Sequence, residues 1–361
     1  MTLPHTPAEI TPEWLTGALS RGGVDGPAVT GFDVENIGEG TGIFGEIVRL
    51  VPSYDGDAPD APATIIAKLP CVEPANLAVA QALGIYQREV RFFETIAPTA
   101  PFRAPACYFS QLDDDGRFVL LLEDLSVDYE VGDQVVGITP EQADPVVDAL
   151  AGFHAAWWET DELHALDWVP VPNAPAYAAA VPDIYSAGLP VLEAEWPDRL
   201  PGGAIDVARR LEPGFAELLQ MTAQGPTTFI HTDTRLDNIF FARDGSGIAL
   251  IDFQLMLRGR GVADIAYLVG TSMNVDDQQE HWERLVRRWH SQIAAAGIDY
   301  PLDDCLTHYR QAALYYLSGA MSLIGSFDTG NERGAALTAA YVTRIFNHVI
   351  DIDAESALDR P

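Results

Sequence analysis

The sequence contains few cysteines and few basic residues. Its three cysteines, Cys71, Cys107 and Cys305, are scattered without metal-ligand spacing, and they are typical of small buried hydrophobes in a reducing cytoplasm. Only 21 lysines and arginines stand against 53 acidic residues, which gives a net charge of −32. Because no basic stripe is present to neutralise phosphates, we do not expect a nucleic-acid partner.

Long apolar runs are also missing. No stretch of about twenty apolar residues is free of charge, so we expect no membrane-spanning segment and no membrane partner. The start of the chain, Met1 to Pro7, lacks a basic segment followed by an apolar one, so we expect no signal peptide and a cytoplasmic location. With 361 residues, 48% of them hydrophobic, the chain is long enough for two lobes and a sizeable core.

The acidic residues are spread along the whole chain. An acidic excess of this size could steer a cationic substrate toward the protein. The even spread instead favours a general adaptation of the source organism's proteins for solubility, such as adaptation to salt. We prefer this second interpretation, because a steering field would need the acids to gather near one site.

Residues 229–254 carry a group of polar side chains typical of phosphoryl transfer. Asp233 follows His231 by two positions, Asn238 follows Asp233 by five, and Asp252 ends the next apolar run. Kinase-type transfer needs one carboxylate to orient and deprotonate the acceptor hydroxyl. It also needs an Asn and a second Asp to hold Mg²⁺ on the phosphates.

The segment between Asn238 and Asp252 is predicted to contain a turn. Residues 244–247 are Asp-Gly-Ser-Gly, a turn signal between two short apolar strands. We expect a hairpin here, which would bring Asn238 close to Asp252.

At these residues the chain resembles the aminoglycoside phosphotransferase and choline kinase-like family, which is related to the protein kinases. The pattern His-x-Asp-x-x-x-x-Asn at 231–238 matches the catalytic loop of that family, and Ile-Asp-Phe-Gln at 251–254 matches its metal-binding motif. The resemblance implies that Asp233 is the catalytic base and that Asn238 and Asp252 are the Mg²⁺ ligands. His231 would be a scaffold residue. Thr232 replaces a glycine that is common in the family, which we interpret as tolerable variation.

The resemblance also implies the fold. We expect an α+β, protein-kinase-like bilobal structure with a strand-rich N-lobe and a mainly helical C-lobe. The nucleotide-binding lobe would cover residues 1–125, and the catalytic and acceptor-binding lobe residues 126–361.

Nucleotide-binding residues are expected in the first lobe. The glycine-rich stretch 38–45, with Gly40 and Gly42, resembles the loop that covers the nucleotide in kinases, although no Lys-Ser or Lys-Thr follows as in a Walker A loop. Lys68, near the end of an apolar strand, matches the kinase lysine that binds the α- and β-phosphates. Its expected partner is Glu89 in a helix over 78–95, with Glu94 as a competitor. Both acids could also be solvent-facing charges.

The connection between the lobes is expected after the apolar run 118–122. By resemblance, the nucleotide base would bind to backbone groups near Glu123 and Leu125. Such a site uses main-chain atoms, so the side chains there carry little information.

The rest of the chain is predicted to be mostly helical. Thr139 and Gln142 form a capping box that opens a helix, and His154 in this helix is interpreted as a packed core residue. Residues 160–203 are rich in proline and are predicted to be irregular. Amphipathic helices are predicted at 282–293, 303–324 and 332–350.

One acidic residue beyond the metal motif is expected to support the site. Asp264 lies in a segment that resembles the family's GxxxxDxA stretch. By resemblance, it would brace the catalytic-loop backbone, in a supporting rather than a catalytic role.

The expected activity is transfer of the γ-phosphate of ATP, with GTP as an alternative donor, to a hydroxyl group of a small molecule. Acceptors in the family include antibiotics, sugars, amino alcohols and hydroxyacyl-CoA esters. The form His-x-Asp-x-Arg-x-Asp-Asn resembles the acyl-CoA dehydrogenase-associated and ecdysteroid kinase-like branches more than the classical resistance enzymes. No Ala-Pro-Glu segment follows the metal motif, which disfavours a protein substrate.

Three questions stay open at this level. Arg235 could contact the γ-phosphate, or it could form a salt bridge with Asp237. The protein could be a catalytically silent nucleotide-binding or scaffold protein with a kinase fold, or an acidic binding protein unrelated to kinases. The sequence predicts no oligomeric state.

Overall fold

The computed structural model describes residues 2–24, 26–37, 44–326 and 332–358. The chain forms two compact units. The first unit comprises residues 1–130, 242–244 and 249–255, and the second comprises residues 131–241, 245–248 and 256–361. Gly40 and Gly42 lie outside the described residues. The assignment of nucleotide binding to residues 1–125 and of catalysis to residues 126–361 stays a prediction.

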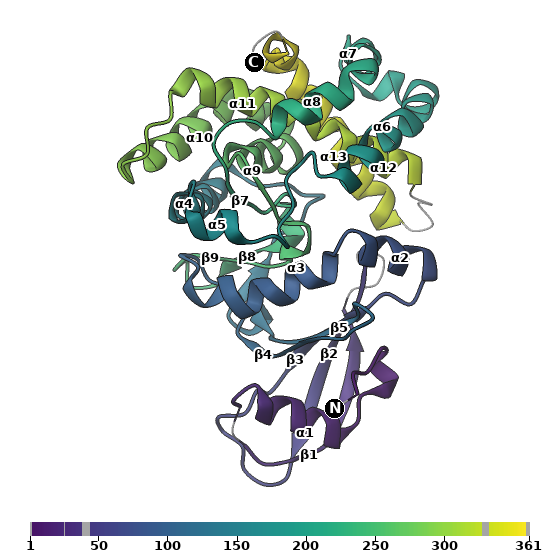
Figure 1. The fold of residues 1–361 in the computed structure, drawn as a ribbon, viewed down its shortest axis with the longest axis vertical. Helices are drawn as coiled ribbons and strands as arrows, with labels where there is room; N and C mark the ends of the chain where they lie inside the picture. Colours follow the sequence, from purple (N-terminus) through teal and green to yellow (C-terminus); the bar gives the residue numbers. More distant parts are fainter. Residues whose placement is uncertain (1, 25, 38–43, 327–331, 359–361) are drawn as a thin grey trace. The chain divides into compact units, whose positions relative to one another are not determined.

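The first unit is built on one antiparallel sheet of five strands in the order β1-β2-β3-β5-β4 (Figure 1). The strands are β1 (Val29–Asn36), β2 (Gly45–Tyr54), β3 (Ile65–Pro70), β4 (Cys107–Leu112) and β5 (Phe118–Glu123). Strand β2 continues through Pro52 to Tyr54.

Helices cover both faces of this sheet (Figure 1). On one face, α1 (Pro12–Arg21) packs on a core that includes Ala67 and Leu69 of β3. Because side chains alternate along a strand, Lys68 points to the opposite face. Helix α3 (Ile85–Arg91) lies on that face, and its Tyr86 stacks on Phe118 with ring centroids 4.4 Å apart.

The helix predicted over 78–95 is divided. Helix α2 (Pro74–Ala82) ends before Gly84, which adopts φ 65° and begins α3. Glycine adopts this left-handed conformation without a steric penalty, so the chain can change direction there. After α3, the turn at Phe92–Ile96 is a π-helix.

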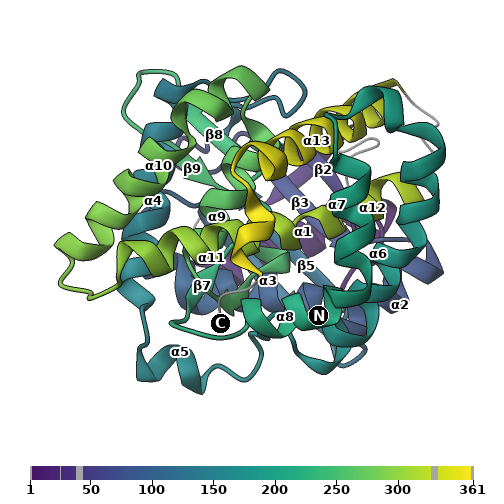
Figure 2. The same cartoon turned by 90° about the horizontal axis from the view of Figure 1, so that it is seen from above.

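The second unit is mainly helical (Figure 2). Its first helices are α4 (Pro140–Trp157), α5 (Asp161–Ala165), α6 (Pro175–Glu195), α7 (Ala204–Leu211) and α8 (Phe215–Thr222). The later helices are α9 (Val262–Tyr267), α10 (Val275–Ala295), α11 (Leu302–Tyr315), α12 (Leu317–Ser326) and α13 (Glu332–Asp351). The capping box predicted at Thr139 and Gln142 is confirmed, and α4 packs beside α10 (Figure 2).

Two secondary-structure predictions in this unit were wrong. Residues 160–203 are not irregular, because α6 runs through Pro182 and Pro190. A proline inside a helix removes one hydrogen bond at a cost of about 3 kcal/mol, which tertiary packing can offset. Helix α6 packs closely on α12, since a Cβ atom at Gly188 would lie 2.5 Å from the carbonyl oxygen of Met321. The helix predicted over 303–324 is divided at Tyr316 into α11 and α12.

Short strands complete the structure. Strands β7 (Thr228–Ile230) and β10 (Leu257–Gly259) pair antiparallel, and β6 (Tyr129–Val131), β8 (Ile239–Ala242) and β9 (Ile248–Leu250) form a sheet in the order β6-β8-β9. The predicted α+β class is confirmed. None of the helices within the described ranges is both long and apolar enough to span a membrane.

Candidate active site

In the first unit, Lys68 lies between two carboxylates. Its Nζ atom is 2.7 Å from Glu89 Oε2 and 2.9 Å from Asp252 Oδ1. Lys68 and Glu89 are 6% and 1% exposed, so the pair is almost completely removed from water. The structure therefore brings together three of the predicted site residues. Glu94, the competitor for Lys68, instead accepts a hydrogen bond from Ser110.

The charges of this cluster oppose the effect of burial. Burial alone would lower the pKa of Lys68, but the nearby carboxylates of Asp252 and Glu89 hold this pKa above its ordinary value. Lys68 therefore stays protonated, as a phosphate-binding lysine must. Burial raises the pKa of Glu89 to about 7, although the positive charge of Lys68 opposes that shift.

The segment around Asp252 is fixed on both sides. Gln254 donates its amide N–H to Asp252 Oδ2 at 3.2 Å, and the Phe253 ring stacks on Phe92 with centroids 3.7 Å apart. Arg88 Nε donates to the carbonyl of Gln254 at 2.8 Å. Helix α3 thus contacts Lys68 through Glu89 and the metal motif through Arg88. No local sequence pattern marks Arg88, because its partner lies 166 residues away.

The two residues predicted near the nucleotide base lie at the end of β5. The N–H of Glu123 donates to the carbonyl of Ala106 at 2.8 Å, and the Glu123 carboxylate binds Arg103 and the N–H of Ala106. The carbonyl of Leu125 accepts from Asp128. Their role in nucleotide binding stays a prediction.

In the second unit, Asp233 has a donor on each carboxylate oxygen. Tyr267 donates its hydroxyl to Oδ1 at 2.7 Å, and Asn238 Nδ2 donates to Oδ2 at 3.1 Å. The same Asn238 nitrogen lies 3.0 Å from the carbonyl of Asp233. Arg235 Nε lies 3.6 Å from Asp233 Oδ2, and Asp237 pairs with Arg333 at 3.2 Å.

Asp264 holds the backbone before Asp233, as the sequence predicted. Its carboxylate accepts hydrogen bonds from the N–H groups of His231 at 2.7 Å and Thr232 at 2.8 Å. His154 is fully buried, as expected, and its Nε2 lies 3.1 Å from Asp264 Oδ2. Because Trp289 donates to Nδ1 of His154, a neutral His154 carries its proton on Nε2 and donates it to Asp264.

Thr232 adopts φ 67°. A β-branched residue in this left-handed region is strained, whereas the family's glycine would fit it without cost. The hydrogen bond from the Thr232 N–H to Asp264 helps to hold the residue in this conformation.

Gln134 holds the other end of the catalytic loop. Its buried side-chain oxygen accepts from the N–H of Leu236 at 2.9 Å, and its nitrogen donates to the carbonyl of Thr271 at 2.9 Å. No sequence signal marks Gln134, because it lies 102 residues before Leu236, in a segment without regular periodicity.

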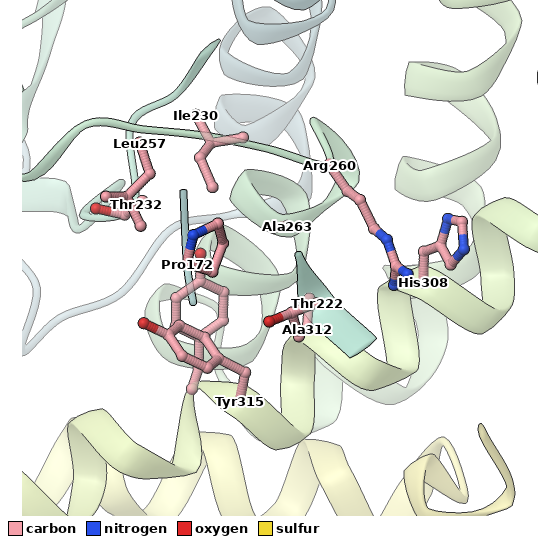
Figure 3. Close-up of a pocket in the computed structure, with 11 residues that line it drawn as sticks. Pro172, Thr222, Ile230, Thr232, Leu257, Arg260, Ala263, His308, Ala312 and Tyr315 are labelled. Atoms are coloured by element: carbon pink, nitrogen blue, oxygen red, sulfur yellow. The ribbon is translucent and has the colours of Figure 1, made fainter. Parts of the chain in front are cut away.

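A cavity of about 20 Å³ lies beside the catalytic loop, within the second unit. Figure 3 shows its lining residues, among them Ile230, Thr232, Pro172, Leu257 and Tyr315. A water molecule needs at least about 10–15 Å³ of such space, so the cavity has room for about one water. It is too small to hold an acceptor molecule without rearrangement.

The donor groups at the predicted metal ligands suit Mg²⁺. Asp252 offers a carboxylate, and Asn238 directs its amide nitrogen to Asp233, which leaves the amide oxygen on the other side. Carboxylate and amide oxygens are ligands that Mg²⁺ accepts, and substrate phosphates commonly supply further ones. Across the described ranges, no group of three or more His, Cys, Asp or Glu is arranged to hold a metal ion.

Comparisons with known proteins agree with this geometry. The model of the Ecdysteroid kinase-like family matches residues 39–297. No curated protein matches the chain. A solved structure of a candidate aminoglycoside phosphotransferase from Ralstonia eutropha JMP134 is similar, with 17% identity, a TM-score of 0.55, and coverage of 96% of this chain and 97% of that chain.

Two further solved structures contain nucleotides. Spectinomycin phosphotransferase APH(9)-Ia, in complex with ADP and spectinomycin, is 12% identical, with a TM-score of 0.51 and coverage of 97% and 99% of the two chains. The GDP and kanamycin complex of APH(2")-IIIa is 14% identical, with a TM-score of 0.53 and coverage of 94% and 98%. At these identities the likeness shows the fold alone, and it confirms the predicted kinase-like fold. The match to the family model confirms the predicted family resemblance.

Proposed function

The chain belongs to the ecdysteroid kinase-like family, and we propose that it transfers the γ-phosphate of ATP to a hydroxyl group of a small molecule. The observation that carries this proposal is the buried Lys68, held between Glu89 and Asp252. A buried ion network of this kind costs desolvation energy, so it is weak support for stability and better support for a functional role.

Lys68 would bind the α- and β-phosphates of the nucleotide. Gly40 and Gly42 would approach the phosphates, and backbone groups near Glu123 and Leu125 would bind the base. We propose ATP as the donor and GTP as an alternative, because similar structures contain ADP in one case and GDP in another.

Asn238 and Asp252 would hold Mg²⁺. The ion would neutralise charge on the phosphates when it is bound. Lys68 at Asp252 Oδ1 and Gln254 at Oδ2 orient the carboxylate before any ligand arrives.

Asp233 would act as the general base. It would accept the hydrogen bond and then the proton of the acceptor hydroxyl, as a positioned carboxylate does in phosphoryl transfer. Arg235, whose guanidinium Nε lies 3.6 Å from Asp233, would contact the γ-phosphate. We propose a small-molecule acceptor and a cytoplasmic location.

Thermal unfolding with nucleotides tests the donor site. The protein would be melted with ATP or GTP, each with and without Mg²⁺, beside Asp252→Ala and the control Asp60→Ala. Asp60 is an exposed carboxylate of the first unit, so its removal changes the net charge equally. We expect the melting temperature to rise by about 3–4 °C at a hundredfold excess over Kd, with Mg²⁺ only.

This stabilisation should be lost in Asp252→Ala and kept in Asp60→Ala. Equal stabilisation of both variants would contradict the role of Asp252, and no stabilisation by either nucleotide would contradict the kinase proposal. Nucleotide binding without any phosphate release or transfer would instead favour a silent nucleotide-binding protein.

A further inference from the structure

The carboxylate of Asp233 accepts hydrogen bonds from two neutral donors in different parts of the second unit, and the cation of Arg235 lies 3.6 Å from its Oδ2. Asn238, five residues later in the same loop, binds Oδ2. Tyr267, the last residue of α9, binds Oδ1 at 2.7 Å. With one donor on each oxygen, rotation of the carboxylate about its bond to Cβ would break at least one hydrogen bond.

Helix α9 places Tyr267 beside the catalytic loop. Asp264 and Tyr267 are three residues apart, so they share one side of the helix. Asp264 binds the backbone at His231 and Thr232, and Tyr267 binds the side chain of Asp233. The same turn of helix thus contacts three consecutive residues of the loop.

The ring of Tyr267 is itself fixed. Tyr316 contacts it edge-on, with ring centroids 4.9 Å apart, and Tyr341 does the same at 5.9 Å. Tyr341 donates its hydroxyl to the carbonyl of Tyr316 at 3.2 Å, which joins these two contacts. Tyr267 is 7% exposed, so the packing leaves it little freedom.

The hydroxyl of Tyr267 keeps its proton. Burial, followed by the nearby charge of Asp233, raises the pKa of Tyr267 well above its ordinary value. A protonated phenol beside a carboxylate donates its hydrogen bond, so Tyr267 serves as a donor to Asp233 at neutral pH.

We propose that Tyr267 is a positioning residue that holds Oδ1 of Asp233 so that Oδ2 receives the proton of the acceptor. This inference rests on the proposed function. In the transfer step, the acceptor O–H bond breaks and its proton moves to the remaining lone pair of Oδ2. The acceptor oxygen bonds to the γ-phosphorus, and the bond to the bridging oxygen breaks to release ADP. Tyr267 keeps its proton throughout.

A double-mutant cycle with water as the acceptor tests the proposal. The variants are Tyr267→Phe, Asp233→Asn and the double variant, and the measurements are kcat and KM for hydrolysis of MgATP by the full chain. We expect Tyr267→Phe to lower kcat by about tenfold to a hundredfold, because misplacement of a general base has effects of this size. The KM for MgATP should change by less than about twofold, since Lys68 and Asp252 are untouched.

The comparison of the double variant with Asp233→Asn separates a positioning role from structural support. If Tyr267 acts through Asp233, the double variant should hydrolyse ATP as fast as Asp233→Asn alone, within about twofold. An equal loss of kcat in both backgrounds would overturn the proposal. The proposal would also be overturned if Tyr267→Phe lowered kcat no more than the control variant, Tyr185→Phe.

The matched control is Tyr185→Phe. It removes another fully buried hydroxyl of the second unit, which donates to the carbonyl of Ala208 at 3.1 Å, and it keeps the ring that stacks on Phe215. We expect its kcat to equal that of the wild type. If the wild type hydrolyses ATP no faster than Asp233→Asn and no nucleotide stabilises it, the proposed function fails, and the positioning role fails with it.

Discussion

The two units hold their candidate site residues by different means. In the first unit, a buried cation, Lys68, is balanced by two carboxylates within 3 Å. In the second unit, the carboxylate of Asp233 receives hydrogen bonds from the neutral donors Tyr267 and Asn238. The first arrangement fixes a charge with two opposite charges. The second fixes a charge mainly with neutral hydrogen-bond donors, while the cation of Arg235 lies farther away, at 3.6 Å from Asp233 Oδ2.

This difference fits the two chemical tasks that we propose for Lys68 and Asp233. A group that binds phosphates must stay positive after burial, which requires compensating negative charge nearby. A general base must be oriented and must still accept a proton, which neutral donors allow at a smaller electrostatic cost. We infer that the first unit is the more sensitive to pH, and that the second depends more on its hydrogen-bonded backbone.

The largest expected effect comes from removing the carboxylate that holds the loop backbone. Asp264→Ala leaves the buried N–H groups of His231 and Thr232 and the ring of His154 without their acceptor. We expect the free energy of unfolding to fall by about 3–5 kcal/mol, measured by urea denaturation. The control Glu195→Ala removes an exposed carboxylate of α6 and should change stability by less than about 0.5 kcal/mol. Similar values for the two variants would contradict the bracing role.

The next effect concerns the charge cluster of the first unit. Burial raises the pKa of Glu89 to about 7 from an ordinary 4.5, so between these values the folded chain binds more protons than the unfolded chain. The stability that this proton provides is complete below pH 4.5 and is lost as the pH rises through 7.

Glu89→Gln should remove this pH dependence. We expect the stability of the variant relative to the wild type to increase from pH 5 to pH 8 by on the order of 3 kcal/mol. Melting or urea curves at several pH values measure the difference. Glu94→Gln is the control, since its carboxylate binds Ser110 rather than Lys68. Parallel profiles for Glu89→Gln and the wild type would show that the folded environment of Glu89 does not raise its pKa.

The smallest effect concerns backbone strain. Its energetic cost differs between one residue of the first unit and one of the second. Asp252 and Thr232 both adopt φ 67°, and Asp tolerates this region better than a β-branched residue does. Thr232→Gly should therefore raise the free energy of unfolding by about 1 kcal/mol. Thr232→Ala keeps a Cβ atom and should give no such gain. Equal stability of the two variants would argue against strain at this position.

Much of the charge cluster around Lys68 in the first unit was predictable from local sequence. A lysine at the end of an apolar strand and a glutamate in the following helix have fixed directions once the strand and the helix form, which is why Glu89 rather than Glu94 reaches Lys68. The capping box at Thr139 is similarly local, because its partners lie within one turn. Residues 160–203 were wrongly predicted to be irregular, because the packing of α6 outweighs the preference of its prolines against helix.

The residues that orient the site were harder to find. Arg88, Gln134 and Tyr267 act on partners 166, 102 and 34 residues away, and no local pattern marks them. Only the spacing of Tyr267 three residues after Asp264 could have suggested that both face the catalytic loop.

The sequence by itself determined the kinase-like class and the order of the motifs, because these depend on residue type and on short spacings. Only the tertiary structure decided which donors hold Asp233 and where a strained backbone is tolerated. Those outcomes depend on burial and on hydrogen bonds between distant segments, and such contacts exist only after the chain has folded.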